Sequence, residues 1–189
     1  AIHYLTSEEI EKDKEYLFSI SSKLKDKNII SLIIGGPTQY YDYSDRNIQE
    51  IFSKVNYLVK ENNLNLVVIP SMRTPKGTIE HAKIYFGNDH LVLDGVDKKA
   101  YLSALSQSKH IVITCDSSSM ISEAALTGKP IYIATIPPKK SDKRFKNFRK
   151  LFQEMKIVRE LGEKLENWNY EKLDETNRVA NIIKDKIQL

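Results

Sequence analysis

The chain has 189 residues, of which 41% are hydrophobic and 29% charged, with 29 lysines and arginines against 25 aspartates and glutamates. This length suits one domain of roughly 100–200 residues and excludes two Rossmann-type domains, and the composition excludes a disordered or fibrous chain. The single cysteine excludes a disulfide framework and a cysteine-rich zinc site, and no apolar run approaches the roughly 20 residues that span a bilayer.

Short β-branched runs alternate with amphipathic helical segments along the chain. The pattern predicts a helix over 7–24, a strand at 29–34, a helix over 45–59, a strand at 64–69 and a helix over 76–86. A strand at 90–93, a helix over 98–106, a strand at 110–114, a helix over 117–126, a strand at 131–135 and helices over 143–155 and 174–187 complete the prediction. Gly128, followed closely by Pro130, marks the end of one helix.

Strands that are separated by helices form βαβ units, in which a parallel sheet is covered on both faces. We therefore expect an α/β fold with a doubly wound, mainly parallel sheet of about six strands and right-handed crossovers, as in Rossmann-like domains. We assign residues 1–28 to a linker and first helix, and residues 29–189 to the Rossmann-like domain.

Polar or glycine-rich segments follow four of the predicted strands. These segments are Gly-Gly-Pro-Thr at 35–38, Ser-Met-Arg-Thr-Pro at 71–75, Cys-Asp-Ser-Ser-Ser at 115–119 and Ile-Pro-Pro-Lys at 136–139. The carboxyl ends of parallel strands share one edge of the sheet, where ligands bind at a topological switch point. The convergence of four such loops is a stronger signal than any single motif.

The pair Gly35-Gly36 permits positive φ angles and close approach of a ligand to the backbone. An ordinary tight turn explains the pair equally well. It is not a GxGxxG fingerprint, which disfavours a dinucleotide-binding dehydrogenase, and the chain contains no GxxxxGK[ST] motif of a P-loop NTPase.

Three serines, Ser117, Ser118 and Ser119, open a helix directly after a strand. A helix N-terminus offers unpaired N–H groups to a phosphate, although simple N-capping needs only one of these serines. Glu123 lies one turn beyond Ser119, where its carboxylate could accept hydrogen bonds from ribose hydroxyls. The alternative is a solvated helix residue, but its apolar flanks indicate that this carboxylate needs a partner.

Cationic side chains supply two further candidates. Arg73 follows the second strand and could pair with a phosphate, or it could be an ordinary surface arginine. The stretch from Lys139 to Lys150 contains seven cations and suits a phosphate, an anionic membrane or a nucleic acid, or simply a solvated helix face. Apolar residues recur within it at helical spacing, and we interpret them as core contacts: Phe145, Phe148, Leu151 and Phe152.

Metal and nucleophile chemistry find little support. The four histidines, His3, His81, His90 and His110, show no ligand spacing, so we propose no metal site. Cys115 ends a buried strand far in sequence from any histidine that could activate it, and apolar burial raises the pKa of a thiol. We interpret it as a buried small residue.

The loop motifs together resemble the mitochondrial fission ELM1-like family. The segments that carry the resemblance are Gly-Gly-Pro-Thr (35–38), Ser-Met-Arg-Thr-Pro (71–75), Thr-Cys-Asp-Ser-Ser-Ser-Met-Ile-Ser-Glu-Ala (114–124), Thr-Gly-Lys-Pro (127–130), Lys-Arg-Phe (143–145) and Leu-Asp-Glu-Thr-Asn-Arg-Val-Ala (173–180). Bacterial members resemble GT-B glycosyltransferases, which have two Rossmann-like domains and hold a nucleotide-sugar donor in the C-terminal one. The resemblance implies that this chain is that C-terminal half and lacks the N-terminal domain.

The resemblance also implies a role for each candidate residue. The donor-binding set is Gly35, Gly36, Thr38, Arg73, Ser117, Ser118, Ser119, Glu123, Lys139 and Arg144, with Glu123 on the ribose and the serines and cations near the diphosphate. The nucleotide-sugar is a substrate, and we expect neither a cofactor nor a metal. The general base and the acceptor site are expected in the N-terminal half, so the chain alone should have no catalytic activity.

A second hypothesis is a non-catalytic module that binds a membrane surface or a protein through the Lys139–Lys150 face. A nucleic-acid partner ranks last, because no recognised aromatic arrangement accompanies the cations. We expect a cytoplasmic location, on the inner face of the membrane if the second hypothesis holds.

Overall fold

Six parallel strands form one sheet in the order β3-β2-β1-β4-β5-β6. The computed structural model describes residues 3–187, and its strands are β1 (Ile29–Ile34), β2 (Asn65–Pro70), β3 (Leu91–Val92), β4 (Ser108–Thr114), β5 (Ile131–Ala134) and β6 (Val158–Glu160). Every residue of β1 is buried, as expected for a central strand covered on both faces. The predicted α/β, doubly wound parallel fold is confirmed.

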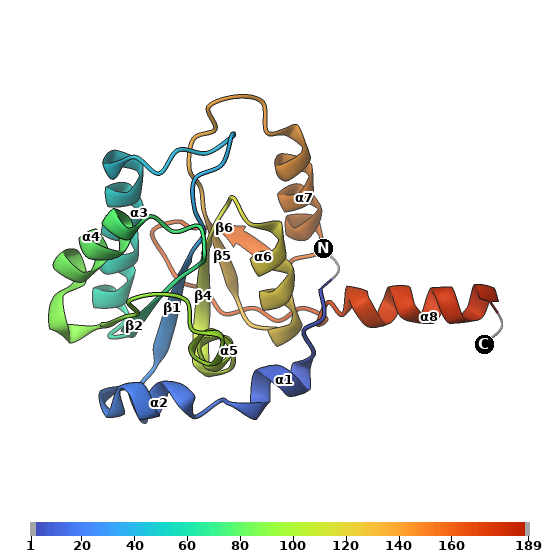
Figure 1. Ribbon diagram of the computed structural model, residues 1–189, viewed down its shortest axis with the longest axis horizontal. Helices are drawn as coiled ribbons and strands as arrows, with labels where there is room; N and C mark the ends of the chain where they lie inside the picture. The colour runs from blue at the N-terminus through green and yellow to red at the C-terminus, as the bar shows by residue number, and fades with distance from the viewer. Residues whose placement is uncertain (1–2, 188–189) are drawn as a thin grey trace.

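Helices connect the strands (Figure 1). They are α1 (Ser7–Lys12), α2 (Tyr16–Ile20), α3 (Asp45–Glu61), α4 (Lys76–Phe86), α5 (Lys98–Gln107), α6 (Ser118–Ala124), α7 (Lys143–Glu154) and α8 (Glu175–Ile187), with short 3₁₀ turns at Ser22–Leu24, Gly87–Asp89 and Ala125–Thr127. Gly128 adopts a left-handed conformation (φ 71°) directly after the last of these turns, as the Gly and Pro signal predicted.

The first predicted helix is interrupted, which is the clearest difference from the expected elements. Thr6 and Glu9 form a reciprocal capping box at the start of α1, but α1 ends at Lys12 and α2 begins at Tyr16. The break is held by α5, because the Ser103 hydroxyl donates to the carbonyl of Lys14 and accepts the amide of Leu17. Tertiary hydrogen bonds therefore override a helical pattern that reads as continuous in the sequence.

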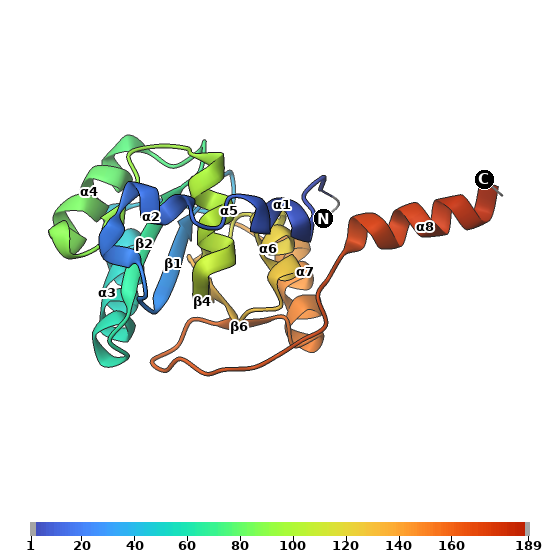
Figure 2. The same cartoon turned by 90° about the horizontal axis from the view of Figure 1, so that it is seen from below.

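The amino-terminal segment is part of the core. Leu5, Ile10, Leu17 and Leu24 are all buried in it, and α1 and α2 pack against α5 (Figure 2). The division of the chain at residue 28 stays a prediction.

The last helix lies outside the body of the domain. Both views show α8 extending away from the sheet and its covering helices, and none of its described residues is buried. Ile182 and Ile183 are exposed on it. No helix within residues 3–187 combines the length and apolar character that crossing a bilayer requires.

Strand order reverses direction between β1 and β4, which are neighbours in the sheet although three helices and two strands separate them in sequence. This junction is the topological switch point of the sheet, and in open α/β sheets ligands bind there, beyond the carboxyl ends of the strands. The loops after β1, β2, β4 and β5 all emerge at this edge, and they contain every residue of the predicted donor-binding set except those in α6 and α7.

Candidate functional site at the carboxyl edge of the sheet

Asp116 is the centre of the hydrogen-bond network at the switch point. Its side chain is fully excluded from solvent and lies just after β4. Oδ2 accepts the Gly36 amide (3.1 Å) and the Arg73 guanidinium (2.9 Å), while Oδ1 accepts the hydroxyls of Tyr43 (2.5 Å) and Thr114 (2.8 Å). A buried carboxylate needs such partners, and here one side chain joins the loops that follow β1, β2 and β4.

Arg73 closes this network from the solvent side. Its Nη1 donates to the carbonyl of Gly36 (3.1 Å), its Nη2 donates to Asp116, and 45% of its side chain remains exposed. The charge of Arg73 is therefore balanced within the protein, and only its outer face is available to a ligand. Arg73 is thus not an ordinary surface arginine, and its contact with a phosphate stays a prediction.

Close packing, and not unusual backbone angles, explains the pair Gly35-Gly36. Neither glycine has a positive φ, so the predicted use of that freedom is wrong. A Cβ on Gly35 would lie 2.2 Å from Asp116 Oδ2, and one on Gly36 would lie 2.1 Å from the carbonyl oxygen of Arg73. Because the Gly35 amide donates to Thr114 (2.8 Å) and the Gly36 amide to Asp116, both amides are already hydrogen-bonded inside the protein.

Thr38 shapes the next turn of the same loop. Its hydroxyl accepts the amides of Tyr40 (3.1 Å) and Tyr41 (3.2 Å), and its own amide donates to the carbonyl of Tyr41. The threonine therefore holds the loop in a compact turn at the carboxyl edge.

The serine segment begins α6 as predicted. Ser117 is the N-cap, with its hydroxyl accepting the Met120 amide at 3.4 Å. Ser118 is half-buried and Ser119 is exposed. Within residues 3–187 the hydroxyls of Ser118 and Ser119 form no hydrogen bond, which leaves two donors at the site beyond the one used for capping.

Glu123 has the partner that its apolar surroundings required. The Tyr101 hydroxyl, from α5, donates to Glu123 Oε2 at 2.6 Å. Burial, reinforced by the nearby Glu123 carboxylate, raises the pKa of Tyr101 well above its ordinary value, so this hydroxyl stays protonated and remains a donor. The sequence pattern gave no sign of this role for Tyr101, because the residue shares a helix face with Leu102 and Leu105.

The loops after β1 and β5 meet at the same edge. The Lys139 amide donates to the carbonyl of Tyr40 (2.7 Å), Tyr41 and Pro138 form an antiparallel bridge, and Lys140 reaches Gln39 at 2.8 Å. Within the described chain the side chains of Lys139 and Arg144 are exposed and form no hydrogen bond or ion pair, so the structure brings them near the edge without joining them to the Asp116 network.

A second buried network underlies this junction and was missed in the sequence. Asp142 accepts the Tyr41 hydroxyl (2.5 Å) and the Arg149 guanidinium (2.9 Å), and Arg149 also donates to the carbonyl of Cys115 (3.3 Å). The hydrogen bond from Tyr41, assisted by Arg149, holds the pKa of Asp142 below its ordinary value despite burial. Arg149 is therefore an internal residue and not part of the basic surface.

Cys115 lies beneath these loops and is buried, as predicted. Burial raises the pKa of its thiol to about 11. Residues 3–187 contain no group of three or more histidine, cysteine, aspartate or glutamate side chains arranged to hold a metal ion.

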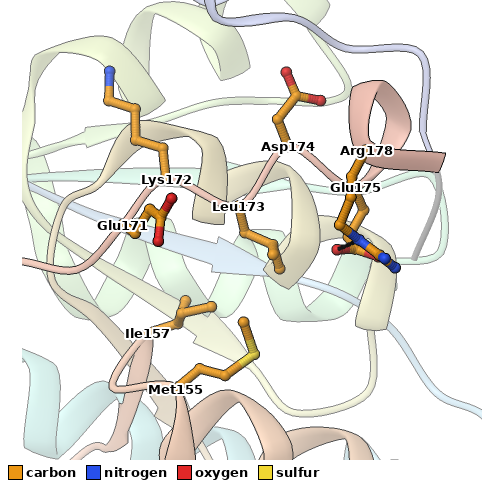
Figure 3. Close-up of a pocket in the computed structure, with 8 residues that line it drawn as sticks. All are labelled: Met155, Ile157, Glu171, Lys172, Leu173, Asp174, Glu175 and Arg178. Atoms are coloured by element: carbon orange, nitrogen blue, oxygen red, sulfur yellow. Dashed lines mark hydrogen bonds and ion pairs between the residues drawn. The ribbon is translucent and has the colours of Figure 1, made fainter. Parts of the chain in front are cut away.

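A separate hollow of about 640 Å³ lies away from this edge, between the end of α7 and the start of α8 (Figure 3). Its floor is apolar and its rim is charged; the lining residues are Met155, Ile157, Glu171, Lys172, Leu173, Asp174, Glu175 and Arg178. Glu175 and Arg178 pair with each other on the rim through two hydrogen bonds of 2.7 and 2.8 Å. None of the predicted site residues lines this hollow, so the candidate site rests on the topology of the sheet and on the residues at its carboxyl edge.

Comparisons with known proteins identify relatives of the chain. The sequence model of the family described as mitochondrial fission ELM1 matches residues 1–187. The chain is 30% identical to the uncharacterized protein RP120 of Rickettsia prowazekii over 171 residues, which is 86% of this chain and 48% of that protein. It is also 30% identical to the mitochondrial fission protein ELM1 of Arabidopsis thaliana over 111 residues, 57% of this chain and 24% of that protein.

Solved structures show the same fold. The UDP-GlcNAc 2-epimerase of Neisseria meningitidis, determined with UDP-GlcNAc bound, superimposes with a TM-score of 0.53 at 14% identity, over 94% of this chain and 41% of that one. An S. aureus MnaA–UDP co-structure superimposes with a TM-score of 0.56 at 20% identity, over 88% of this chain and 40% of that one. The chain thus spans less than half the length of these relatives and has the Rossmann-like fold expected of a GT-B domain.

Proposed function

Because the chain belongs to the mitochondrial fission ELM1 family, we propose that it is the donor-binding domain of a GT-B glycosyltransferase. In this function it holds a nucleotide-sugar by its diphosphate and ribose while an acceptor hydroxyl attacks the anomeric carbon and the nucleoside diphosphate leaves. The binding site for the acceptor and the general base belong to a second domain.

The observation that carries the proposal is the convergence of four loops at the switch point of the sheet, next to a serine segment with two unused hydroxyls. The β4–α6 turn presents Ser118 and Ser119 where the start of a helix favours an anion. Glu123 follows Ser119 by four residues on α6, so it lies one turn further along the same helix face, where its carboxylate is assigned to the ribose.

Each member of the site contributes a separate interaction. The serine hydroxyls donate to the diphosphate, and the exposed face of Arg73, whose charge Asp116 balances, offers N–H donors at the same edge. Tyr101 fixes the Glu123 carboxylate so that a second oxygen lone pair accepts from the ribose. Lys139 and Arg144 supply further charge as the leaving group forms, since both are exposed and unpaired within the described residues.

Similar folds support the class of ligand. The two solved neighbours were determined with UDP-GlcNAc and with UDP, and their likeness to this chain covers 94% and 88% of its residues. A uridine nucleotide is therefore the first ligand to test.

Titration calorimetry of the chain with UDP, GDP, ADP and CMP tests the proposal. We expect saturable binding of at least one nucleotide, weakened about 10-fold or more in Glu123→Gln, since a hydrogen bond to a charged group contributes about 1.5–3 kcal/mol. Glu80→Gln is the matched control, because Glu80 is exposed on α4, away from the site. Failure to bind any of the four nucleotides, or equal losses in the two variants, would reject the site.

A further inference from the structure

An uncompensated positive surface lies at one corner of the domain, beside the candidate site. We call it the basic ridge and define it by five exposed residues in the loop after β5 and the first turns of α7: Lys139, Lys140, Lys143, Arg144 and Lys146. Within residues 3–187 none of the five forms an ion pair with a carboxylate. The ridge therefore carries five positive charges between residues 139 and 146, none of them paired with a carboxylate among the described residues.

The acidic residues nearest in sequence are paired with other cations. Asp142 is buried and bound to Arg149 at 2.9 Å, and Glu154 pairs with Lys150 at 3.7 Å, one turn further along α7. Both pairs remove one positive and one negative charge from the local balance. The unpaired charge is thus confined to the loop and to the amino-terminal half of α7.

The ridge is held rigidly. Phe152 and Arg149 fix the inner face of α7 to the body of the domain, since both are buried. The loop before α7 is fixed by the Lys139–Tyr40 hydrogen bond and by the Tyr41–Pro138 bridge. The five charges are therefore displayed on a fixed surface, unlike those of a flexible basic tail.

One exposed apolar side chain lies beside the ridge on the same helix. Leu151 is 52% exposed, and it follows Arg144 by seven residues, which places the two on one side of α7. Leu151 was expected to contact the core, and that prediction is wrong. A surface that combines cations with an exposed aliphatic side chain is suited to the boundary between lipid headgroups and acyl chains.

We propose that the basic ridge, with Leu151, docks the domain on an anionic lipid bilayer. Four of the five cations are lysines, whose compact charges suit a diffuse field of headgroups more than the bidentate recognition that arginine provides. The aromatic rings beside the ridge are all half-buried, since Phe145 and Phe148 pack against the core and Tyr40 packs on Phe145 with Lys140 Nζ 5.1 Å above its ring, so none is fully exposed to stack on a base. The ridge shares Lys139 and Arg144 with the proposed donor site, so the test uses Lys143 and Lys146, which that site does not include.

The test is co-sedimentation of the chain with vesicles of phosphatidylcholine that contain 30% phosphatidylglycerol, at about 50 mM and about 300 mM salt. Lys143→Gln/Lys146→Gln removes two ridge charges and avoids every residue of the donor-binding set. At about 1 kcal/mol per cation, we expect vesicle affinity to fall about 25-fold in this variant, with UDP binding unchanged. Lys23→Gln/Lys27→Gln is the control with the same change in net charge, on two exposed residues before β1.

Three results would overturn the proposal. Equal binding to vesicles of pure phosphatidylcholine would exclude an electrostatic contact. An equal loss of vesicle affinity in Lys23→Gln/Lys27→Gln would show that the effect follows from net charge alone. Tighter binding to single-stranded RNA than to vesicles at the same salt would instead assign the ridge to nucleic acid. Leu151→Gln separates the two partners further, because it should weaken vesicle binding several-fold and leave RNA binding unaltered.

Discussion

Arg149 donates a 2.9 Å hydrogen bond to Asp142 in a site where each side chain is only 10% exposed. Removing the arginine leaves a buried carboxylate with Tyr41 as its remaining side-chain partner. Arg149→Met should therefore destabilise the chain by about 3–5 kcal/mol, measured by urea unfolding. Arg144→Met is the matched control on the exposed face of α7, where we expect less than about 0.5 kcal/mol. Similar midpoints for the two variants would contradict a buried ion pair.

The glycine pair offers a second stability test. Gly35→Ala and Gly36→Ala each place a Cβ within 2.2 Å of an atom that belongs to another loop, and we expect each to cost about 3 kcal/mol through overpacking. Gly77→Ala is the control: it lies in α4 with nothing within 4 Å, so alanine should be neutral or stabilise by up to about 1 kcal/mol. Thermal unfolding of the three variants gives the comparison, and tolerance of alanine at Gly35 would show that its loop is not held against Asp116.

The buried His110 should make the free energy of unfolding depend on pH. Burial, assisted by the nearby charge of Lys109, lowers the pKa of this imidazole, and its Nδ1 has no hydrogen-bond partner among the described residues. As pH falls below about 6.5, the unfolded chain takes up a proton that the folded chain resists, so the free energy of unfolding decreases.

His90, whose pKa is also lowered by burial, acts in the same direction. His110→Phe removes one of these contributions, and its unfolding free energy should fall less steeply between pH 7 and pH 5 than that of the unaltered chain. Parallel slopes in urea titrations at several pH values would show that His110 does not titrate differently in the two states.

Cys115 provides a chemical test of the loops above it. With a pKa of about 11, only about one molecule in 1,000 carries a thiolate at pH 8, against about a quarter for an exposed cysteine. Alkylation by iodoacetamide should therefore be at least about 200-fold slower in the native chain than in urea. Mass spectrometry after timed quenching measures both rates, and rapid native labelling would mean that the loops after β4 and β5 open readily.

The strands and the site edge could be predicted because their signals are local. A continuous apolar run such as Ile29–Ile34 suits a strand buried on both faces, and parallel topology then places every following loop at one edge. The Gly35-Gly36 pair and Ser117 were placed at the edge by this argument, and Glu123 by its helical spacing after Ser119. The three-residue strand β6 was not, since Val158–Glu160 is too short to carry a pattern.

Residues that act across long separations in sequence were not predicted. Tyr43 and Tyr101 hold Asp116 and Glu123 from 73 and 22 residues away, and nothing local distinguishes these tyrosines from others. Arg149 did carry a signal, because it falls between Phe145 and Phe152 at core spacing. A guanidinium inside the domain needs a carboxylate as its partner. Asp142 lies seven residues earlier in the same stretch and is that partner.

The exposed position of α8 also determines which part of the chain unfolds cooperatively. Since the helix contributes no buried side chain, it adds little to the heat capacity change or to the denaturant sensitivity of the domain. Its amides should exchange with deuterium at nearly the rate of an isolated 13-residue helix, which is marginal in water. The cooperative unit of the described chain therefore ends near Thr176, whose hydroxyl accepts the His3 amide and donates to the His3 carbonyl, and the rest of α8 should unfold independently of the sheet.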